Sequence, residues 1–388
     1  MPADTVSSST LGWTPVWAMP NVTLDDPVET SHAALVTLQD ERLRAIAEQH
    51  TTFDVFLRSF RNEFGVQISP TVALLREGAP ESVRTVEAFG GLRDAVCVSA
   101  IVAGHALNLK MKLPRGVRYS DAFDVYPWFP SQQNDGHIVA VTRALVAMDS
   151  AESLQPQSSP ALAERSLAPG DLDDVLLRAL LAHWEDSFAT GNDTIENRRL
   201  FRALEMARAA SRLPGGTDAT FFDEGRAVAL WVSAFEILVH DGKWSGLKEV
   251  LTRLDQVQWL RAKLKLQDQQ VKIGKKETFQ TNVAGEVYGH LNRVRNDFLH
   301  GNPVTPETLK LAKRQQSVLL FAAPLFRLAL TASLNLRFSE TLPDTTDARG
   351  WGERIGRRTT FHAFQRLAED AILMADEAPD QRPPAGLA

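Results

Sequence analysis

Cysteine is almost absent from this chain, since Cys97 is the only one in 388 residues. A single cysteine excludes an intrachain disulfide and any zinc cluster built on cysteines, and it is typical of a reducing compartment. The sequence also lacks a phosphate-binding Walker loop, a dinucleotide glycine fingerprint and paired histidines at HxxxH or HExxH spacing. We therefore expect neither a metal nor a cofactor.

Signals for export and for membrane insertion are also missing. Residues 1–10 contain no lysine or arginine and no apolar core, so they do not have the character of a signal peptide. The most membrane-like stretch, 317–336, contains Pro324 and Arg327, which favours a buried helix over a membrane span. We expect a cytoplasmic protein that has no membrane partner.

The length predicts two to three domains, at about 150 residues each. Hydrophobic residues make up 44% and charged residues 23%, which is ordinary globular composition. Residues 151–170 contain three prolines and four serines, a composition typical of a linker. The predicted organisation is an N-terminal domain of unknown type over 1–150, the linker, a helical domain over 171–337, a helical extension over 338–378 and a disordered tail over 379–388.

In the N-terminal domain we expect mainly helices, with room for a few short strands. The first 20 residues are predicted to form an irregular arm, followed by a helix over 40–61, a short strand over 66–75 and a buried helix over 93–109. Aromatic residues gather over 119–130, where Asp121 and Asp124 would repel phosphates. This favours an aromatic patch packed on the second domain over a base-stacking surface.

After the linker, regular stop signals predict an antiparallel helical bundle, so the fold class is mainly α. The predicted helices cover 171–190, 194–213, 222–240, 244–266 and 281–300. A lysine-rich loop is expected over 272–276. A further helix is expected after Thr305, with Pro306 in its first turn, and a last one over 351–375.

The helix predicted over 281–300 places polar residues beside an apolar stripe. The stripe has intervals of four, three and four residues and consists of Val287, Leu291, Val294 and Phe298. Arg295 and His300 are about 140° apart around a helix, and the long arginine side chain can bring both heads to one patch. Arginine can hold phosphate oxygens and histidine can move protons. The simpler interpretation is a surface arginine and a histidine that interacts with the helix dipole.

The run 295–301, Arg-Asn-Asp-Phe-Leu-His-Gly, resembles the signature of HEPN domains. In that family an arginine followed by a polar residue precedes a histidine near a helix end. Residues 227–238 resemble the family's earlier core helix, with acidic Glu236 among apolar residues. The Apea-like HEPN proteins are the group that the chain resembles most. The resemblance covers 171–336.

This resemblance implies a metal-independent endoribonuclease that uses the 2′-hydroxyl of RNA as its nucleophile. His300 would be the general acid or base, Arg295 would stabilise charge on the phosphate, and Asn296 would orient one of them. It also implies a homodimer in which two motifs face each other, and a role in phage defence or toxin-like growth arrest. The alternative is a non-catalytic HEPN module that binds a nucleotide or a protein partner.

Two further sets of charged residues have open interpretations. Glu236 is expected either at the edge of the core or as a partner that orients Arg295. Residues 241–300 contain 11 lysines and arginines against seven acidic residues, and this local positive charge favours a path for RNA. The candidate RNA contacts are Lys272, Lys275, Lys276 and Arg293. The alternative is that these side chains are simply solvated.

Overall fold

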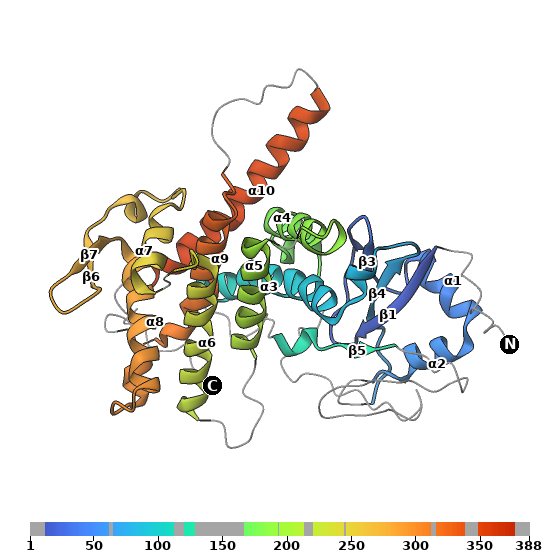
Figure 1. The fold of residues 1–388 in the computed structure, drawn as a ribbon, viewed down its shortest axis with the longest axis horizontal. Coiled ribbons are helices and arrows are strands. Elements are labelled where there is room, and N and C mark those ends of the chain that lie inside the picture. Colours follow the sequence, from blue (N-terminus) through green and yellow to red (C-terminus); the bar gives the residue numbers. More distant parts are fainter. Residues whose placement is uncertain are drawn as a thin grey trace, which may run out of the picture. The chain divides into compact units, whose positions relative to one another are not determined.

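The computed structural model describes residues 12–61, 65–111, 120–128, 167–192, 194–212, 220–243, 246–311, 316–337 and 348–376 (Figure 1). The protein is mainly helical and has a small antiparallel sheet. It divides into two compact units. The sheet unit comprises Met1–Arg93, Arg118–Leu172 and Leu180–Thr194, and the helical unit comprises Asp94–Val117, Asp173–Ala179 and Ile195–Ala388. The predicted tail and most of the predicted linker lie outside the described residues.

The sheet unit is built on five strands in the order β2-β3-β4-β1-β5, and all neighbouring pairs are antiparallel. The strands are β1 (Trp13–Met19), β2 (Val28–Glu29), β3 (Ala33–Val36), β4 (Thr71–Arg76) and β5 (Tyr126–Pro127). The β1–β4 register shifts between Pro15 and Trp17, because proline has no N–H for the ladder. The prediction of an irregular arm was therefore wrong for Trp13–Met19, which forms a strand of the sheet.

Two short helices, α1 (Glu41–Gln49) and α2 (Thr51–Ser59), replace the single helix predicted over 40–61. Asp40 caps α1, and the extended backbone of His50 separates the two. Their apolar residues share a core with Trp128, whose ring lies 5.1 Å from Phe53 and 5.0 Å from Phe56. Tyr126 and Trp128 of the aromatic segment thus pack on the core of the sheet unit itself.

Helices α3 (Val86–Met111) and α4 (Asp174–Trp184) each contribute residues to both units. The predicted boundary at 150 therefore differs from the observed division, in which Asp94–Val117 belongs to the helical unit. A π-helical turn, Glu185–Ala189, continues α4, and Gly191 ends it with a positive φ of 72°. Short 3₁₀ turns occupy Glu81–Arg84, Ser120–Phe123 and Pro169–Asp171.

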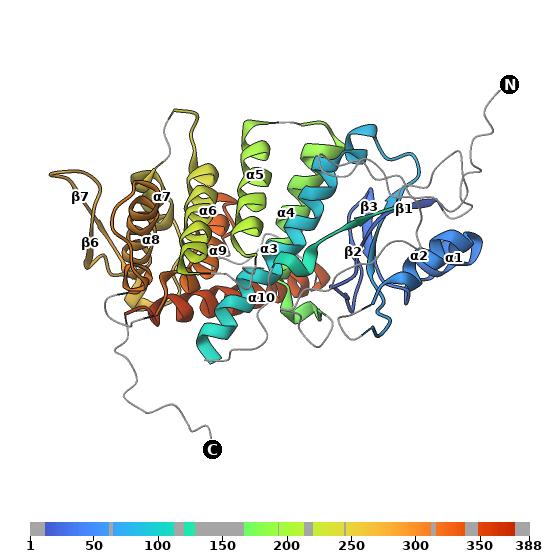
Figure 2. The same cartoon turned by 90° about the horizontal axis from the view of Figure 1, so that it is seen from below.

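In the helical unit, α5 (Ile195–Ala210), α6 (Phe221–Val239) and α8 (Val283–Leu299) lie side by side (Figures 1 and 2). Helices α6 and α8 are antiparallel, because the first residues of α6 contact the end of α8. They pack with α7 (Leu247–Asp255) and α9 (Ala322–Ser333), and α10 (Ala348–Leu373) packs against α8 and α9.

Three predicted segments of this unit differ from the structure. Helix α7 ends at Asp255, and the chain continues through a 3₁₀ turn, Ala262–Lys265. The predicted lysine-rich loop is the tip of a hairpin formed by β6 (Gln269–Lys272) and β7 (Thr278–Thr281). The predicted helix after Thr305 is one 3₁₀ turn, Pro306–Leu309. A last 3₁₀ turn, Val318–Phe321, leads into α9. Within the described residues, no helix is both long and apolar enough to cross a bilayer.

A buried ion pair connects α4, α9 and α10. Asp173, directly before α4, accepts a 2.5 Å bond from Nε of Arg327, and both residues are at most 1% exposed. Nη1 of Arg327 donates to Gln365 at 2.7 Å, and the Gln365 amide donates to Glu369 at 2.8 Å. The Glu369 carboxylate also accepts the backbone N–H groups of Leu260 and Arg261. Asp173 also accepts the N–H of Leu176 in the first turn of α4.

We predict that Asp173→Asn lowers the free energy of unfolding by about 3–5 kcal/mol, because it leaves the charge of Arg327 buried without its counter-ion. Chemical denaturation followed by circular dichroism measures the change. Glu277→Gln is the matched control, since it removes the carboxylate of the exposed Lys248–Glu277 pair. Equal effects of the two variants would contradict a special role for the buried pair.

Candidate functional site

Arg295 is held by a carboxylate of the neighbouring helix. Its Nη2 donates to both oxygens of Glu236 at 2.7 Å, and its Nη1 donates to Oδ1 of Asn296 at 2.9 Å. About one-fifth of each side chain of the pair is exposed, 22% for Arg295 and 19% for Glu236. The structure therefore contains the contact expected if Glu236 orients the guanidinium, and the position is set by the packing of α6 on α8.

Asn292, a buried residue that the sequence interpretation missed, extends this contact. The Asn296 amide donates to Oδ1 of Asn292 at 3.3 Å, and Tyr288 is buried one turn earlier. Burial raises the pKa of Tyr288 well above its usual value, and the charge of Glu236 acts in the same direction. Tyr288, Asn292 and Asn296 are spaced by four residues. That spacing was the signal for a polar line along one face of the helix.

Burial also dominates the protonation of Glu236. It raises the pKa of this carboxyl, and the charge and hydrogen bonds of Arg295 offset only part of the effect. Glu249 adds repulsion that raises the pKa further. Ionisation of Glu236 therefore lowers the stability of the folded protein. Such a cost is typical of groups kept for function, although structural ion pairs show it too.

His300 ends α8. Its backbone N–H donates to the Asn296 carbonyl at 3.0 Å, and Gly301, with φ of 72°, turns the chain away. The His300 side chain is exposed, and in the part of the chain that the structure describes no contact joins it to Arg295. Side chains lean toward the start of their helix, and Glu236 draws Arg295 in that direction. The described residues thus show no contact between Arg295 and His300, and their placement at one patch stays a prediction.

The predicted RNA-binding lysines lie away from the end of α8. Lys272 ends β6, and Lys275 and Lys276 lie at the hairpin tip, all three exposed (Figure 1). The hairpin packs on α8 where Val271 contacts Gly289. Eleven residues of helix, about 16 Å at 1.5 Å per residue, separate this contact from His300. The structure brings Arg295, Asn296 and Glu236 together, whereas the lysines lie on the hairpin that packs on α8 at Gly289.

Arg293 is the remaining predicted RNA contact, and it interacts with a histidine of its own helix. Its Nη2 lies against Nδ1 of His290. Burial, followed by the charge of Arg293, lowers the pKa of His290 to about 4. The neutral ring can therefore accept a hydrogen bond from Arg293 at neutral pH.

An aromatic patch lies at the same end of the bundle as His300. Phe221 and Phe222 at the start of α6 stack at 4.2 Å, and both meet Phe298 edge to face. The Phe298 ring lies directly over Gly225, where a Cβ would come within 2.2 Å of it. Phe222 is 53% exposed and Leu299 is 61% exposed. We call Phe221, Phe222, Phe298 and Leu299 the terminal patch. It is a candidate contact surface because it contains large apolar side chains that are exposed to solvent.

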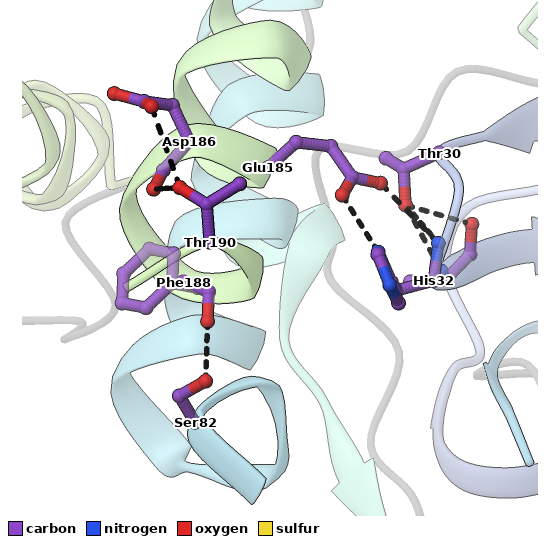
Figure 3. A network of polar contacts seen from close by, with 8 residues as sticks. Thr30, His32, Ser82, Glu185, Asp186, Phe188 and Thr190 are labelled. Carbon is purple, nitrogen blue, oxygen red and sulfur yellow. Dashed lines mark hydrogen bonds and ion pairs between the residues drawn. The ribbon is translucent and has the colours of Figure 1, made fainter. Parts of the chain in front are cut away.

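A second polar cluster occurs in the sheet unit, around the π-helical turn (Figure 3). The Glu185 carboxylate contacts Nδ1 of His32 at 2.7 Å and accepts the His32 backbone N–H at 3.2 Å. Thr30 also accepts that N–H, and the Ser82 hydroxyl donates to the Phe188 carbonyl. These contacts attach the turn between β2 and β3 to the π-helical turn, and they attach Ser82 to it as well. The role of the cluster is therefore structural.

The described residues contain no group of three or more His, Cys, Asp or Glu side chains that could hold a metal ion. No protein-family model matches the chain, and neither a curated protein nor a solved structure is similar to it. The resemblance to HEPN domains thus stays a prediction from the residues of α6 and α8.

We predict that the stability of the wild type relative to Glu236→Gln falls as the pH rises above about 4.5, the usual pKa of a glutamate. A raised pKa means that the folded state binds the proton more tightly than the unfolded state, so stability is lost as the proton leaves. Denaturant unfolding of both proteins between pH 4 and pH 7.5 measures this. The opposite trend would show that pairing with Arg295 outweighs burial.

Proposed function

We propose that the helical unit is a HEPN-type, metal-independent endoribonuclease. The observation that carries the proposal is the fixed Arg295: the partly buried carboxylate of Glu236 on α6 orients its guanidinium beside Asn296, one turn before the histidine that ends α8. In this role the 2′-hydroxyl of RNA attacks the adjacent phosphorus. A 2′,3′-cyclic phosphate forms, and the 5′-oxygen leaves with a proton.

The chemistry available to these side chains fits that reaction. A guanidinium has five N–H groups, and the bonds to Glu236 and Asn296 use three of them. The other two can donate to the non-bridging oxygens of a phosphate, where developing negative charge needs stabilisation. His300 is exposed at the helix end, where it can reach a bound substrate as a general acid or base.

A second copy of the chain would complete the site. Within the described residues of one protomer no contact joins Arg295 to His300, and two proton transfers call for two groups. The terminal patch beside His300 offers an apolar surface for a symmetric contact. A two-fold axis through this patch would place two motifs face to face. The proposed protein is thus a cytoplasmic homodimer that acts on RNA in phage defence or toxin-like growth arrest.

A second candidate function is a non-catalytic HEPN module that binds a nucleotide or a protein partner. The closed contact between Arg295 and Glu236 favours it, because a guanidinium neutralised by a carboxylate attracts phosphate less strongly than a free one. In this case Arg295 is a structural residue of the α6–α8 contact, and the terminal patch holds the partner.

We predict that the purified protein cleaves RNA in the presence of EDTA and that His300→Ala lowers the single-turnover rate by about 10²–10⁴-fold, the usual contribution of a general acid or base. Products ending in a 2′,3′-cyclic phosphate are expected. His50→Ala is the matched control, because His50 is also an exposed histidine at the C-cap of a helix.

Equal rates for wild type and a folded His300→Ala protein would remove His300 from the catalytic residues. Absence of cleavage by the wild type, together with tight binding of a nucleotide or protein, would favour the non-catalytic module.

The dimer gives a separate prediction. Phe222→Ser with Leu299→Ser should convert the dimer into a monomer and reduce cleavage, because it removes the two most exposed side chains of the terminal patch. Sedimentation equilibrium measures the molar mass. Leu266→Ser, which changes a residue with 55% exposure elsewhere in the unit, is the control. A monomeric wild type, or an undisturbed dimer in the double variant, would contradict this arrangement.

A further inference from the structure

The first half of α10 is a largely exposed helical segment of the described chain. Six consecutive residues, 352–357, are exposed. Since a helix has 3.6 residues per turn, six in a row include every face. In Figure 1 this half extends away from the other helices of its unit, whereas the second half packs on α8 and α9.

This segment is strongly basic in a chain of net charge −6. Residues 348–360 contain four arginines and one glutamate. Arg354, Arg357 and Arg358 are spaced i, i+3 and i+4, so they form one row. We call these three residues the arginine row. Arg354 and Arg357 are exposed, and Arg358 is half-buried.

The arginine row continues the face that α10 turns toward the core. Phe361 and Gln365 follow Arg354 at seven and eleven residues, and both are buried. Along one face, the helix therefore changes from residues that pack in the protein to residues that carry positive charge. This face of α10 is therefore suited to a negatively charged partner that lies against the bundle.

The same segment is a poor helix by itself. Gly350, Gly352 and Gly356 lie within two turns, and each glycine costs about 1 kcal/mol relative to alanine in a helix. No atom lies within 4 Å of a Cβ built at Gly352 or Gly356, so internal packing does not require glycine there. The intrinsic helix propensity of this segment is therefore low, and a bound partner would stabilise the helix.

We propose that the arginine row of α10 binds the phosphate backbone of RNA and that binding stabilises the first half of the helix. Guanidinium groups donate two parallel hydrogen bonds to phosphate oxygens, and phosphates at successive nucleotides can meet a row of cations. The choice of RNA among polyanions rests on the proposed function. The three arginines of the row belong to α10, whereas Arg295 and His300 belong to α8 and its C-cap.

The test measures binding without cleavage, with full-length His300→Ala protein and a fluorescent single-stranded RNA. Adding Arg354→Gln and Arg357→Gln should weaken binding on the order of tenfold at 0.1 M salt and reduce the slope of log affinity against log salt by about 1.4, at 0.7 per phosphate contact. Glutamine keeps helix propensity close to that of arginine. The matched control is Arg44→Gln with Arg84→Gln, two exposed arginines of the sheet unit.

Hydrogen exchange locates the contact. Amides of 352–358 should gain protection when RNA is added, and the Arg354/Arg357 variant should lose that gain. Gly352→Ala with Gly356→Ala, on the opposite side of the helix, should bind RNA as tightly as the parent or more tightly. Weaker binding by this alanine variant would place the contact on the glycine side and overturn the assignment.

The outcomes separate this inference from the proposed function. Arginine-dependent RNA binding by a wild type that does not cleave supports the inference and removes the nuclease proposal. If the wild type cleaves RNA and the arginine and control variants bind RNA equally, the nuclease proposal is supported and the inference is overturned. Protection of 352–358 by an acidic protein or by anionic vesicles, with none from RNA, would overturn the inference as well.

Discussion

The buried pair of Asp173 and Arg327 is the constraint on which the helical unit depends. A guanidinium at 1% exposure is stable only with a counter-ion and hydrogen bonds, so α4 and α9 have to meet where these two residues lie. Gln365 and Glu369 extend the network to α10 and to the backbone at Leu260 and Arg261. Breaking one contact of such a network leaves its partners buried without hydrogen bonds, which costs free energy. The helices that surround the candidate site therefore keep one arrangement.

The pairing of Arg295 with Glu236 repeats this principle near the surface, with a different consequence. The pair is partly exposed, and burial still raises the pKa of the glutamate. The pair joins α6 to α8 and fixes the guanidinium beside Asn296. In the proposed nuclease, a second protomer would bring the other motif to this guanidinium.

The positive charge of the helical unit is spread over separate surfaces. The lysines of the β6–β7 hairpin lie near the first half of α8, and the arginine row lies on α10. The excess of basic over acidic residues in 241–300 shows where positive charge lies along the chain. It gives no information on the distance of these residues from His300. That distance follows from the packing of Val271 on Gly289. An RNA held by both surfaces would be positioned by elements remote from the motif.

The sequence by itself predicted α5, α6 and α8 of the helical unit, because apolar periodicity and stop signals such as Gly301 are local properties. It left two interpretations of Glu236 open, and pairing with Arg295 was one of them. Only the tertiary structure decided that Trp13–Met19 is a strand, since a strand is stabilised by pairing with residues 50 or more positions away. It likewise decided that Arg295 contacts Glu236. The direction of a long side chain depends on the charge that a neighbouring helix brings within reach, and spacing along one helix does not contain that information.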